Sequence, residues 1–96
     1  RDGGGWTGPD RGQARIEVDL RGMRVDEMEL ELVRALDQAL IEDLSELRII
    51  HGKGTGALRA RATEMLKLDA RVQEFRMGGP TEGGAGVTVA QFRSGT

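Results

Sequence analysis

Residues 47–59 read LRIIHGKGTGALR and contain a predicted strand, a glycine loop and the start of a helix. The apolar run at 47–50 ends where the glycines begin, which is typical of a short buried strand. From Ala57 to about residue 68, apolar side chains recur at helical spacing, which predicts an amphipathic helix. Because Thr55 directly precedes this helix, its hydroxyl is a candidate N-cap that accepts a backbone N–H of the first turn.

Four more elements are expected on either side of this unit. Alternating apolar residues predict a strand at 14–20, and apolar residues three and four positions apart predict a helix at about 25–42. Two further strands are expected at 72–77 and 87–92, separated by a glycine-rich loop. Three more apolar residues widen the stripe of the first helix, which is therefore expected to contact more than one neighbour: Leu30, Val33 and Ile41.

The order of these elements, βαβαββ, predicts an α/β fold of the α+β sandwich type. We expect a small mixed four-stranded sheet with two helices. Strand–helix–strand units favour parallel neighbouring strands joined by right-handed crossovers. The last two strands are close enough in sequence to form an antiparallel hairpin. Four strands are too few for elaborate double winding, so both helices are expected on one face.

Length and composition exclude several classes of protein. With 96 residues and a net charge of −2, the chain is about one small domain, and nucleic-acid binding would need a local basic patch. The absence of cysteine excludes disulfides and thiolate zinc sites, and the single histidine, His51, excludes a multi-histidine metal site. No apolar run approaches the roughly 18–20 residues that span a bilayer. We therefore expect no membrane partner and, by elimination, a cytoplasmic protein.

The first 13 residues differ in composition from the rest of the chain. Residues 1–13, RDGGGWTGPDRGQ, are dominated by glycine, proline and polar side chains, which predicts a flexible linker. Residues 14–96 are expected to form the folded domain. Because the chain starts at Arg1 without a methionine, we expect it to be a piece of a longer protein.

Polar side chains follow the first two predicted strands. Asp19 and Arg21 are two residues apart at the end of the first strand, so they share a face, and His51 and Lys53 follow the second strand. Ligands of open α/β sheets bind beyond the carboxyl ends of parallel strands. If the two strands are neighbours, these four side chains converge on one spot that suits an anionic substrate.

The glycine loop adds a second feature of an anion site. Gly52, Gly54 and Gly56 allow backbone N–H groups to face outward just before a helix N-terminus, which favours phosphate binding. His51 can move a proton near neutral pH. A proton-transferring histidine beside cations and free N–H groups can cleave a phosphodiester, because it combines acid–base catalysis with stabilisation of transition-state charge.

Each of these features also has a purely structural interpretation. Asp19 and Arg21 can form a structural ion pair, His51 can be a satisfied polar residue at a strand end, and glycines before a helix can form a tight turn. Arg59 and Arg61 either extend a basic surface or only solvate the second helix. The run Gly83–Gly86 is either a mobile flap near the site or a plain connector.

Two nucleotide-binding motifs are excluded. Gly52 and Lys53 are followed by Gly54 instead of serine or threonine, so the loop is not a P-loop. Gly52, Gly54 and Ala57 satisfy G-x-G-x-x-A between a strand and a helix, but the chain is too short for a normal dinucleotide-binding domain.

Three stretches together resemble the Smr (small MutS-related) domain family. They are VDLRG at 18–22, IIHGKGTGALR at 49–59 and EGGAGVTV at 82–89. The resemblance extends over roughly residues 16–93 and assigns residues 14–96 to the Smr domain. The chain is most similar to the C-terminal domain of bacterial MutS-like proteins that suppress homologous recombination, in which a linker joins this domain to an ATPase core.

The resemblance implies a fold similar to the C-terminal domain of bacterial translation initiation factor three, and an endonuclease that nicks DNA or RNA, often branched or structured. The family motif D-L-[HR] falls on Asp19, Leu20 and Arg21, and the motif H-G-x-G falls on 51–54. Many family nucleases have histidine where this chain has Arg21. Because His51 is the single histidine here, a two-histidine mechanism is impossible.

The first hypothesis is a nicking endonuclease within a larger MutS-like ATPase that acts on branched or nicked DNA. His51 would be the general acid or base, Asp19 would orient it or bind Mg²⁺ or Mn²⁺ loosely, and Arg21 with Lys53 would bind the phosphate. The parent protein would be dimeric through its ATPase part. The remaining phosphate-binding candidates come from the loop and the second helix: Gly52, Gly54, Thr55, Gly56 and Arg59.

Two alternatives stay open. A non-cleaving adaptor would use the same cations to bind branched DNA, RNA or the ribosome. A protein-interaction module would not bind nucleic acid at moderate salt. Cleavage that is lost without His51 while binding is retained would favour the endonuclease over both.

Overall fold

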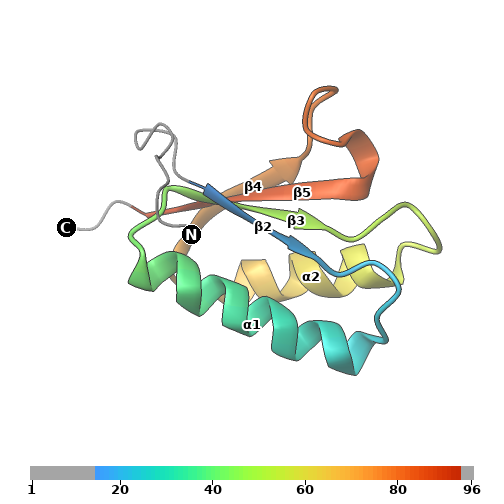
Figure 1. The fold of residues 1–96 in the computed structure, drawn as a ribbon, viewed down its shortest axis with the longest axis horizontal. Helices are drawn as coiled ribbons and strands as arrows, with labels where there is room; N and C mark the ends of the chain where they lie inside the picture. Colours follow the sequence, from blue (N-terminus) through green and yellow to red (C-terminus); the bar gives the residue numbers. More distant parts are fainter. Residues whose placement is uncertain (1–14, 94–96) are drawn as a thin grey trace, which may run out of the picture.

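The computed structural model describes residues 15–93, which form one sheet and two helices (Figure 1). The elements, in chain order, are β2 (Arg15–Asp19), α1 (Val25–Ile41), β3 (Glu46–Ile50), α2 (Ala57–Leu68), β4 (Val72–Met77), the 3₁₀ turn η2 (Gly84–Gly86) and β5 (Val87–Phe92). The predicted mixed four-stranded sheet with two helices is confirmed. The linker expected at residues 1–13 lies outside the described residues. Within the described part, neither helix is long and apolar enough to cross a membrane.

The sheet has the strand order β2-β3-β5-β4. β2 and β3 are parallel neighbours, as expected for a strand–helix–strand unit, and β5 is antiparallel to both β3 and β4. The expectation of parallel neighbours is wrong for the second unit, because β5 lies between β3 and β4. The chain leaves β4 through a hairpin, and β5 fills the position that the crossover through α2 leaves open.

Both helices cover the same face of the sheet, as predicted (Figure 1). Alternation along the strands turns one set of side chains toward the helices, and these join the apolar stripes of α1 and α2 in one core. The three residues expected to widen the stripe of α1 do not join it, because Leu30, Val33 and Ile41 are 67%, 44% and 76% exposed. Val25 and Leu40 of the same helix are also exposed. Helix α1 contacts α2, β2 and β3, so the expectation that it contacts more than one neighbour is confirmed, although these exposed residues are not part of the core. The core contains Val18, Leu20, Met28, Leu32, Leu36, Leu47, Ile49, Ala62, Leu66, Val72 and Ala90.

The start of α2 differs in one detail from the sequence-based expectation. The N-cap position is Gly56, with a φ of 86° that favours glycine. The Thr55 hydroxyl still accepts a hydrogen bond from the backbone N–H of Ala57 at 3.2 Å. Thr55 therefore stabilises the first turn from one position before the cap.

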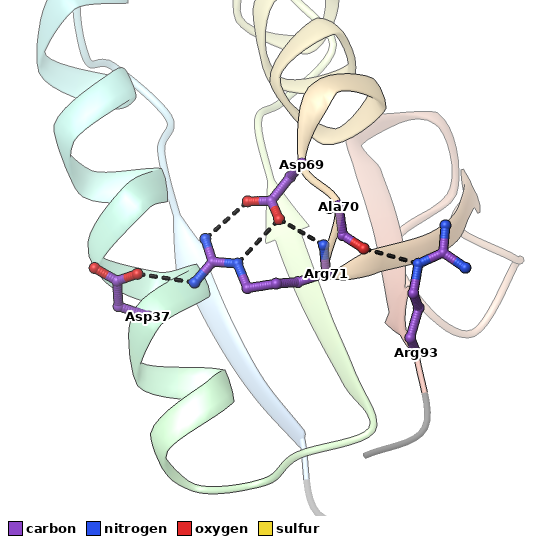
Figure 2. Close-up of polar contacts among 5 residues, drawn as sticks. All are labelled: Asp37, Asp69, Ala70, Arg71 and Arg93. Carbon is purple, nitrogen blue, oxygen red and sulfur yellow. Dashed lines mark hydrogen bonds and ion pairs between the residues drawn. The ribbon is translucent and has the colours of Figure 1, made fainter. Parts of the chain in front are cut away.

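A clasp around Arg71 fixes the other end of α2 (Figure 2). Arg71 donates to both carboxylate oxygens of Asp69 at 2.9 and 2.7 Å, and to Asp37 of α1 at 2.9 Å. These hydrogen bonds lower the pKa of the Asp69 carboxyl and raise the pKa of Arg71. Arg93 donates to the Ala70 carbonyl at 2.7 Å, which ties the end of the described chain to the same turn. Helix α2 is thus anchored away from its glycine loop.

Replacing Arg71 with methionine is expected to lower the free energy of unfolding by about 1.5–3 kcal/mol, because Asp69 loses its charged donors. The Asp69 side chain is only 16% exposed, so water replaces these donors poorly. As a control, Asp37→Asn changes only the exposed arm of the clasp and should cost about 0–1 kcal/mol. Urea unfolding of the three proteins measures both values, and equal losses in the two variants would contradict the asymmetry.

Candidate functional site

The ends of β2 and β3 bring the two sequence motifs into contact. The Leu20 N–H donates to the Ile50 carbonyl at 2.8 Å, which continues the parallel pairing to the last residue before each motif. Gly52 then turns with a φ of 80°, and a Cβ built on it would lie 3.3 Å from Cγ of Arg21. Glycine at this position therefore allows both the turn and the close passage of the Arg21 side chain.

Asp19 and Arg21 form a three-point pair. Arg21 donates from its backbone N and its Nε to Oδ1 of Asp19, at 3.0 and 2.9 Å, and from Nη2 to Oδ2 at 2.7 Å. The side-chain hydrogen bonds from Arg21 are the main cause that lowers the pKa of the Asp19 carboxyl from 3.8 to about 2. They also raise the pKa of Arg21. Asp19 is therefore an ionised carboxylate that holds the exposed guanidinium in place.

His51 is buried and held at both ring nitrogens. It is 5% exposed, with Nδ1 2.9 Å from the Gly52 carbonyl and Nε2 2.9 Å from the Thr88 hydroxyl. A carbonyl can only accept, so Nδ1 carries the hydrogen, and in the neutral ring Nε2 accepts from Thr88. The expectation that Asp19 orients His51 is wrong, because these two partners orient the ring and Asp19 is bound to Arg21.

A cleft of about 630 Å³ opens on the face of the sheet away from the helices. Arg21, Gly52 and Lys53 line it, together with Arg48 of β3 and Glu82 from the loop before β5. Arg48 alternates with core residues along its strand, which places the cleft on the uncovered face.

The predicted convergence of four side chains is therefore only partly met. Arg21 and Lys53 line the cleft, and Asp19 lies beside it as the partner of Arg21. His51 does not line the cleft, because it turns toward Thr88 on the helix-covered side of the sheet.

The glycine loop gathers the other predicted phosphate-binding residues. Within residues 15–93, no hydrogen bond occupies the backbone N–H groups of 53–56. Unoccupied N–H groups before a helix N-terminus, beside cations, can bind an anion. A common hollow of about 280 Å³ is lined by Gly52, Lys53, Gly54, Thr55, Gly56, Arg59 and Ala85.

The loop before β5 is a fixed wall of this site. The Gly86 carbonyl accepts hydrogen bonds from the backbone N–H groups of His51 and Gly52, both at 3.0 Å. Gly83 has a φ of 109°, and a Cβ on it would lie 2.4 Å from Cγ2 of Val87. These contacts dock the Gly83–Gly86 segment against the H-G-x-G motif. The segment is therefore neither a free flap nor a plain connector, but a part of the site.

The site residues that were not predicted from the sequence include Arg48 and Glu82, which line the cleft. The same holds for Thr88, which binds the His51 ring, and for Gly86, which binds the backbone of the glycine loop. The sequence does offer a clue to Thr88, because it is a hydroxyl residue within the apolar run VTVA. A buried hydroxyl needs a hydrogen-bond partner, and His51 provides it.

Asp19, the predicted metal ligand, does not suit a metal ion in this structure. Both carboxylate oxygens of Asp19 are engaged by the Arg21 guanidinium, which already supplies the positive charge that a cation would bring. Within residues 15–93 there is no group of three histidine, aspartate or glutamate side chains that could hold a metal ion.

Replacing Gly52 with alanine is expected to disturb the Asp19–Arg21 pair, whereas Gly22→Ala leaves it intact. Both glycines have a φ of 80°, but a Cβ at Gly22 meets no atom within 4 Å. Each variant should lose about 1–2 kcal/mol of stability from backbone strain. Only Gly52→Ala should also raise the pKa of Asp19 from about 2 toward 3.8.

Carboxyl ¹³C NMR titration measures this difference. A depressed pKa means that ionised Asp19 stabilises the fold above its unfolded pKa, and this contribution is lost as the pH falls toward 2. Gly52→Ala should therefore flatten the acid limb of the stability curve relative to Gly22→Ala. An unchanged Asp19 midpoint in Gly52→Ala would show that Arg21 does not depend on the missing Cβ.

Comparison with known proteins identifies the family. The family model described as the Smr domain matches residues 18–93. A protein named Endonuclease MutS2 from Gemmatimonas aurantiaca is 65% identical over 76 residues, which cover 79% of this chain and 9% of that protein. A second protein with this name, from Symbiobacterium thermophilum, is 54% identical over 77 residues, covering 80% of this chain and 10% of that protein.

Two solved structures share the fold. The Smr domain of Thermus thermophilus MutS2 has a TM-score of 0.77 and 53% identity, covering 80% of this chain and 96% of that one. YdaL, a stand-alone small MutS-related protein from Escherichia coli, has a TM-score of 0.80 and 25% identity, covering 88% of this chain and 71% of that one. The chain spans about a tenth of the length of the curated relatives it matches. The resemblance noted in the sequence is confirmed, and the chain belongs to the Smr domain family.

Proposed function

We propose that this chain is a nicking endonuclease domain that cleaves DNA as part of a larger MutS2-like protein. The observation that carries the proposal is the loop at 52–56, where unoccupied N–H groups, Lys53 and Arg59 surround one hollow next to Arg21. Relatives at 65% and 54% identity are named Endonuclease MutS2, which supports the same chemistry for this chain.

The substrate phosphate would bind at the glycine loop. The N–H groups of 53–56 and the cations Arg21 and Lys53 are placed to stabilise the extra negative charge that develops on a phosphorane-like transition state. Asp19 acts as a positioning residue, because its three hydrogen bonds hold the Arg21 guanidinium at the edge of the cleft. This arrangement supplies electrostatic stabilisation without any rearrangement of the loop.

His51 would supply the proton transfer. Its Nδ1–H is fixed on the Gly52 carbonyl, which leaves Nε2 as the basic nitrogen. A water molecule that hydrogen-bonds to Thr88 would attack the phosphorus, and the P–O bond to the leaving sugar oxygen would break. Thr88 can take the proton of this water and pass its own to Nε2. The imidazolium would then return a proton by the same route to the leaving oxygen, which restores the neutral ring. Acid–base transfer through one bridging group is within the usual reach of a catalytic histidine.

The length of the relatives supports a larger protein as the setting of this activity. The matched proteins are about ten times longer than this chain, so the parent protein would deliver the domain to its substrate. We propose branched or nicked DNA as that substrate, a dimeric ATPase as the parent protein, a role in suppressing recombination, and the cytoplasm as the location. The net charge of −2 favours a weak isolated domain that depends on the parent protein for affinity.

A plasmid-nicking assay tests the proposal. The 96-residue chain is incubated with supercoiled plasmid or a structured RNA in Mg²⁺, Mn²⁺ or EDTA. We expect conversion of the plasmid to the relaxed form, with activity that co-elutes with the protein. Because Asp19 is committed to Arg21, we also expect nicking to persist in EDTA. Nicking that EDTA abolishes would instead support the Mg²⁺ or Mn²⁺ ion that the first sequence-based hypothesis placed at Asp19.

The burial of His51 favours one alternative, a non-cleaving adaptor. A ring that is 5% exposed and bonded at both nitrogens also fits a structural role, in which it braces the loop that binds phosphate. The adaptor would bind DNA, RNA or the ribosome without breaking a bond. Binding in a gel-shift assay without any nicking of either nucleic acid would support the adaptor and contradict the endonuclease.

A further inference from the structure

Within residues 15–93, three cations of the glycine loop and helix α2 lack a carboxylate partner. Within the part of the chain that the structure describes, Lys53, Arg59 and Lys67 form no ion pair, whereas Arg61 on the same helix is paired with two glutamates at 2.6 and 2.7 Å. The structure thus separates the two arginines, which were expected either to extend a basic surface or only to solvate the helix. Arg61 belongs to a salt-bridge network, and the charge of Arg59 is free for a ligand.

Two of these cations line a groove between α2 and β4. Arg59, Thr63 and Lys67 follow one another at four-residue spacing on one face of α2, and with Met77 and Thr88 of the sheet they border a groove of about 440 Å³. The helix rises about 1.5 Å per residue, so the two cations are about 12 Å apart along it. That length matches about three to four nucleotides of a stacked strand at about 3.4 Å each.

The lining of the groove suits a nucleic-acid strand better than a free anion. Phe75 lines the groove and Met77 is 57% exposed beside the cations, so the groove offers an aromatic ring and apolar surface for bases as well as charge for phosphates. Grooves that combine cations with surfaces on which bases stack are typical of proteins that bind single strands. A small anion would use only one end of such a groove.

The groove is continuous with the site at the glycine loop. Arg59 lines both the groove and the loop hollow, and Lys53 lines both the loop hollow and the cleft. The path therefore leads from Lys67 along α2, over the loop and onto the opposite face of the sheet at Arg21. It bends around the edge of the domain within a few nucleotides.

We propose that the groove between α2 and β4 binds a single nucleic-acid strand and guides it into the glycine loop, an inference that rests on the proposed function of that loop. A duplex is too stiff to follow the bend, because its persistence length is about 150 base pairs. The strand would pass over Thr88, which lines the groove and whose hydroxyl bonds to His51 at 2.9 Å. The groove thereby leads the substrate to the polar link with the proposed acid–base residue.

The salt dependence of binding tests this proposal. Fluorescence anisotropy of a labelled oligothymidylate is measured across a salt series for the wild type and for Arg59→Ala/Lys67→Ala. Each lost phosphate contact should reduce the slope of log K against log salt by about 0.7, so by about 1.4 for the double variant. Arg24→Ala/Arg34→Ala removes the same charge from exposed cations beside and on α1 and should leave the slope unchanged.

The outcomes separate this inference from the proposed function. If the slope of log K against log salt changes equally in both double variants, or changes in neither, the groove does not bind the strand. If a duplex of the same sequence binds as tightly, and its slope falls as much in Arg59→Ala/Lys67→Ala, the preference for a single strand is contradicted. If the wild type nicks plasmid but the slope is the same in Arg59→Ala/Lys67→Ala, only the groove proposal is contradicted. If the slope falls in this variant but the wild type does not nick, strand binding in the groove is supported and the endonuclease is contradicted.

Discussion

Replacing His51 with alanine is expected to slow plasmid nicking by about 10²–10⁴-fold, the range for loss of an acid–base residue. The ring is the single imidazole of the sequence, so no second histidine can take over its role. Binding of the plasmid should persist, because Lys53, Arg59 and the loop N–H groups remain. Nicking rates and gel shifts measured on the same preparation give both quantities.

The burial of His51 requires a second variant, because alanine also leaves a cavity. Thr88→Val keeps the shape of the side chain and removes the hydroxyl bonded to Nε2, whereas Thr88→Ser keeps the hydroxyl. If the proton passes through this hydroxyl, Thr88→Val should lose nicking and Thr88→Ser should retain it. A folded Thr88→Val protein with the wild-type rate would contradict the relay, and a folded His51→Ala protein with that rate would contradict the mechanism.

Arg21→Ala is expected to lower the nicking rate by about 10²–10³-fold, comparable to the loss of one donor to a transition-state oxyanion. The guanidinium lines the cleft and is oriented by Asp19 at 2.7–3.0 Å. Arg21→Lys keeps the charge but cannot reproduce the fork geometry, so it should restore only part of the rate. Single-turnover nicking at saturating protein separates this effect from weaker binding.

Arg48 provides the matched control for this prediction. It lines the same cleft but is paired with Glu17 at 2.8 Å and is only 19% exposed, so its charge is already compensated. Arg48→Met removes the same charge and should leave the nicking rate within a few-fold of the wild type. Equal losses in Arg21→Ala and Arg48→Met would show that the general potential of the cleft matters and that the position of Arg21 does not.

Much of the fold follows from apolar spacing alone. The predicted helix at 57–68 and the strands at 72–77 and 87–92 coincide with α2, β4 and β5. Helical and strand periods differ, so runs of this length can be told apart. The ends of two strands are also marked in the sequence, since Gly22 follows β2 and the glycine loop follows β3.

The position of β5 between β3 and β4 could not be predicted in the same way. The spacing of side chains along a strand specifies which face is buried, but not which strands become neighbours. The exposure of Leu30, Val33 and Ile41 on α1 has a related cause. Apolar spacing predicts a helix face, whereas the four-stranded sheet and α2 are too small to cover every apolar residue of that helix.

The site could be predicted as residue types but not as contacts. Asp19, Arg21 and Lys53 were expected at one edge of the sheet, and Arg21 with Lys53 lines one cleft there. The direction of His51 depends on alternation at the strand end, which turns it to the helix-covered side and toward Thr88 of β5. Because β5 is distant in sequence, the contact between Thr88 and His51 depends on the order of strands in the sheet. Apolar spacing does not predict that order.

The most direct test of the proposed site is an NMR titration of the ¹⁵N-labelled chain with an oligothymidylate. If phosphates bind at the glycine loop, the largest amide shift changes should fall at residues 52–56 and 84–86, followed by the exposed face of α2. The exposed face of α1, which lines neither the cleft, the loop hollow nor the groove, should not respond. Shift changes centred on α1 or on the clasp, with none at 52–56, would contradict the account.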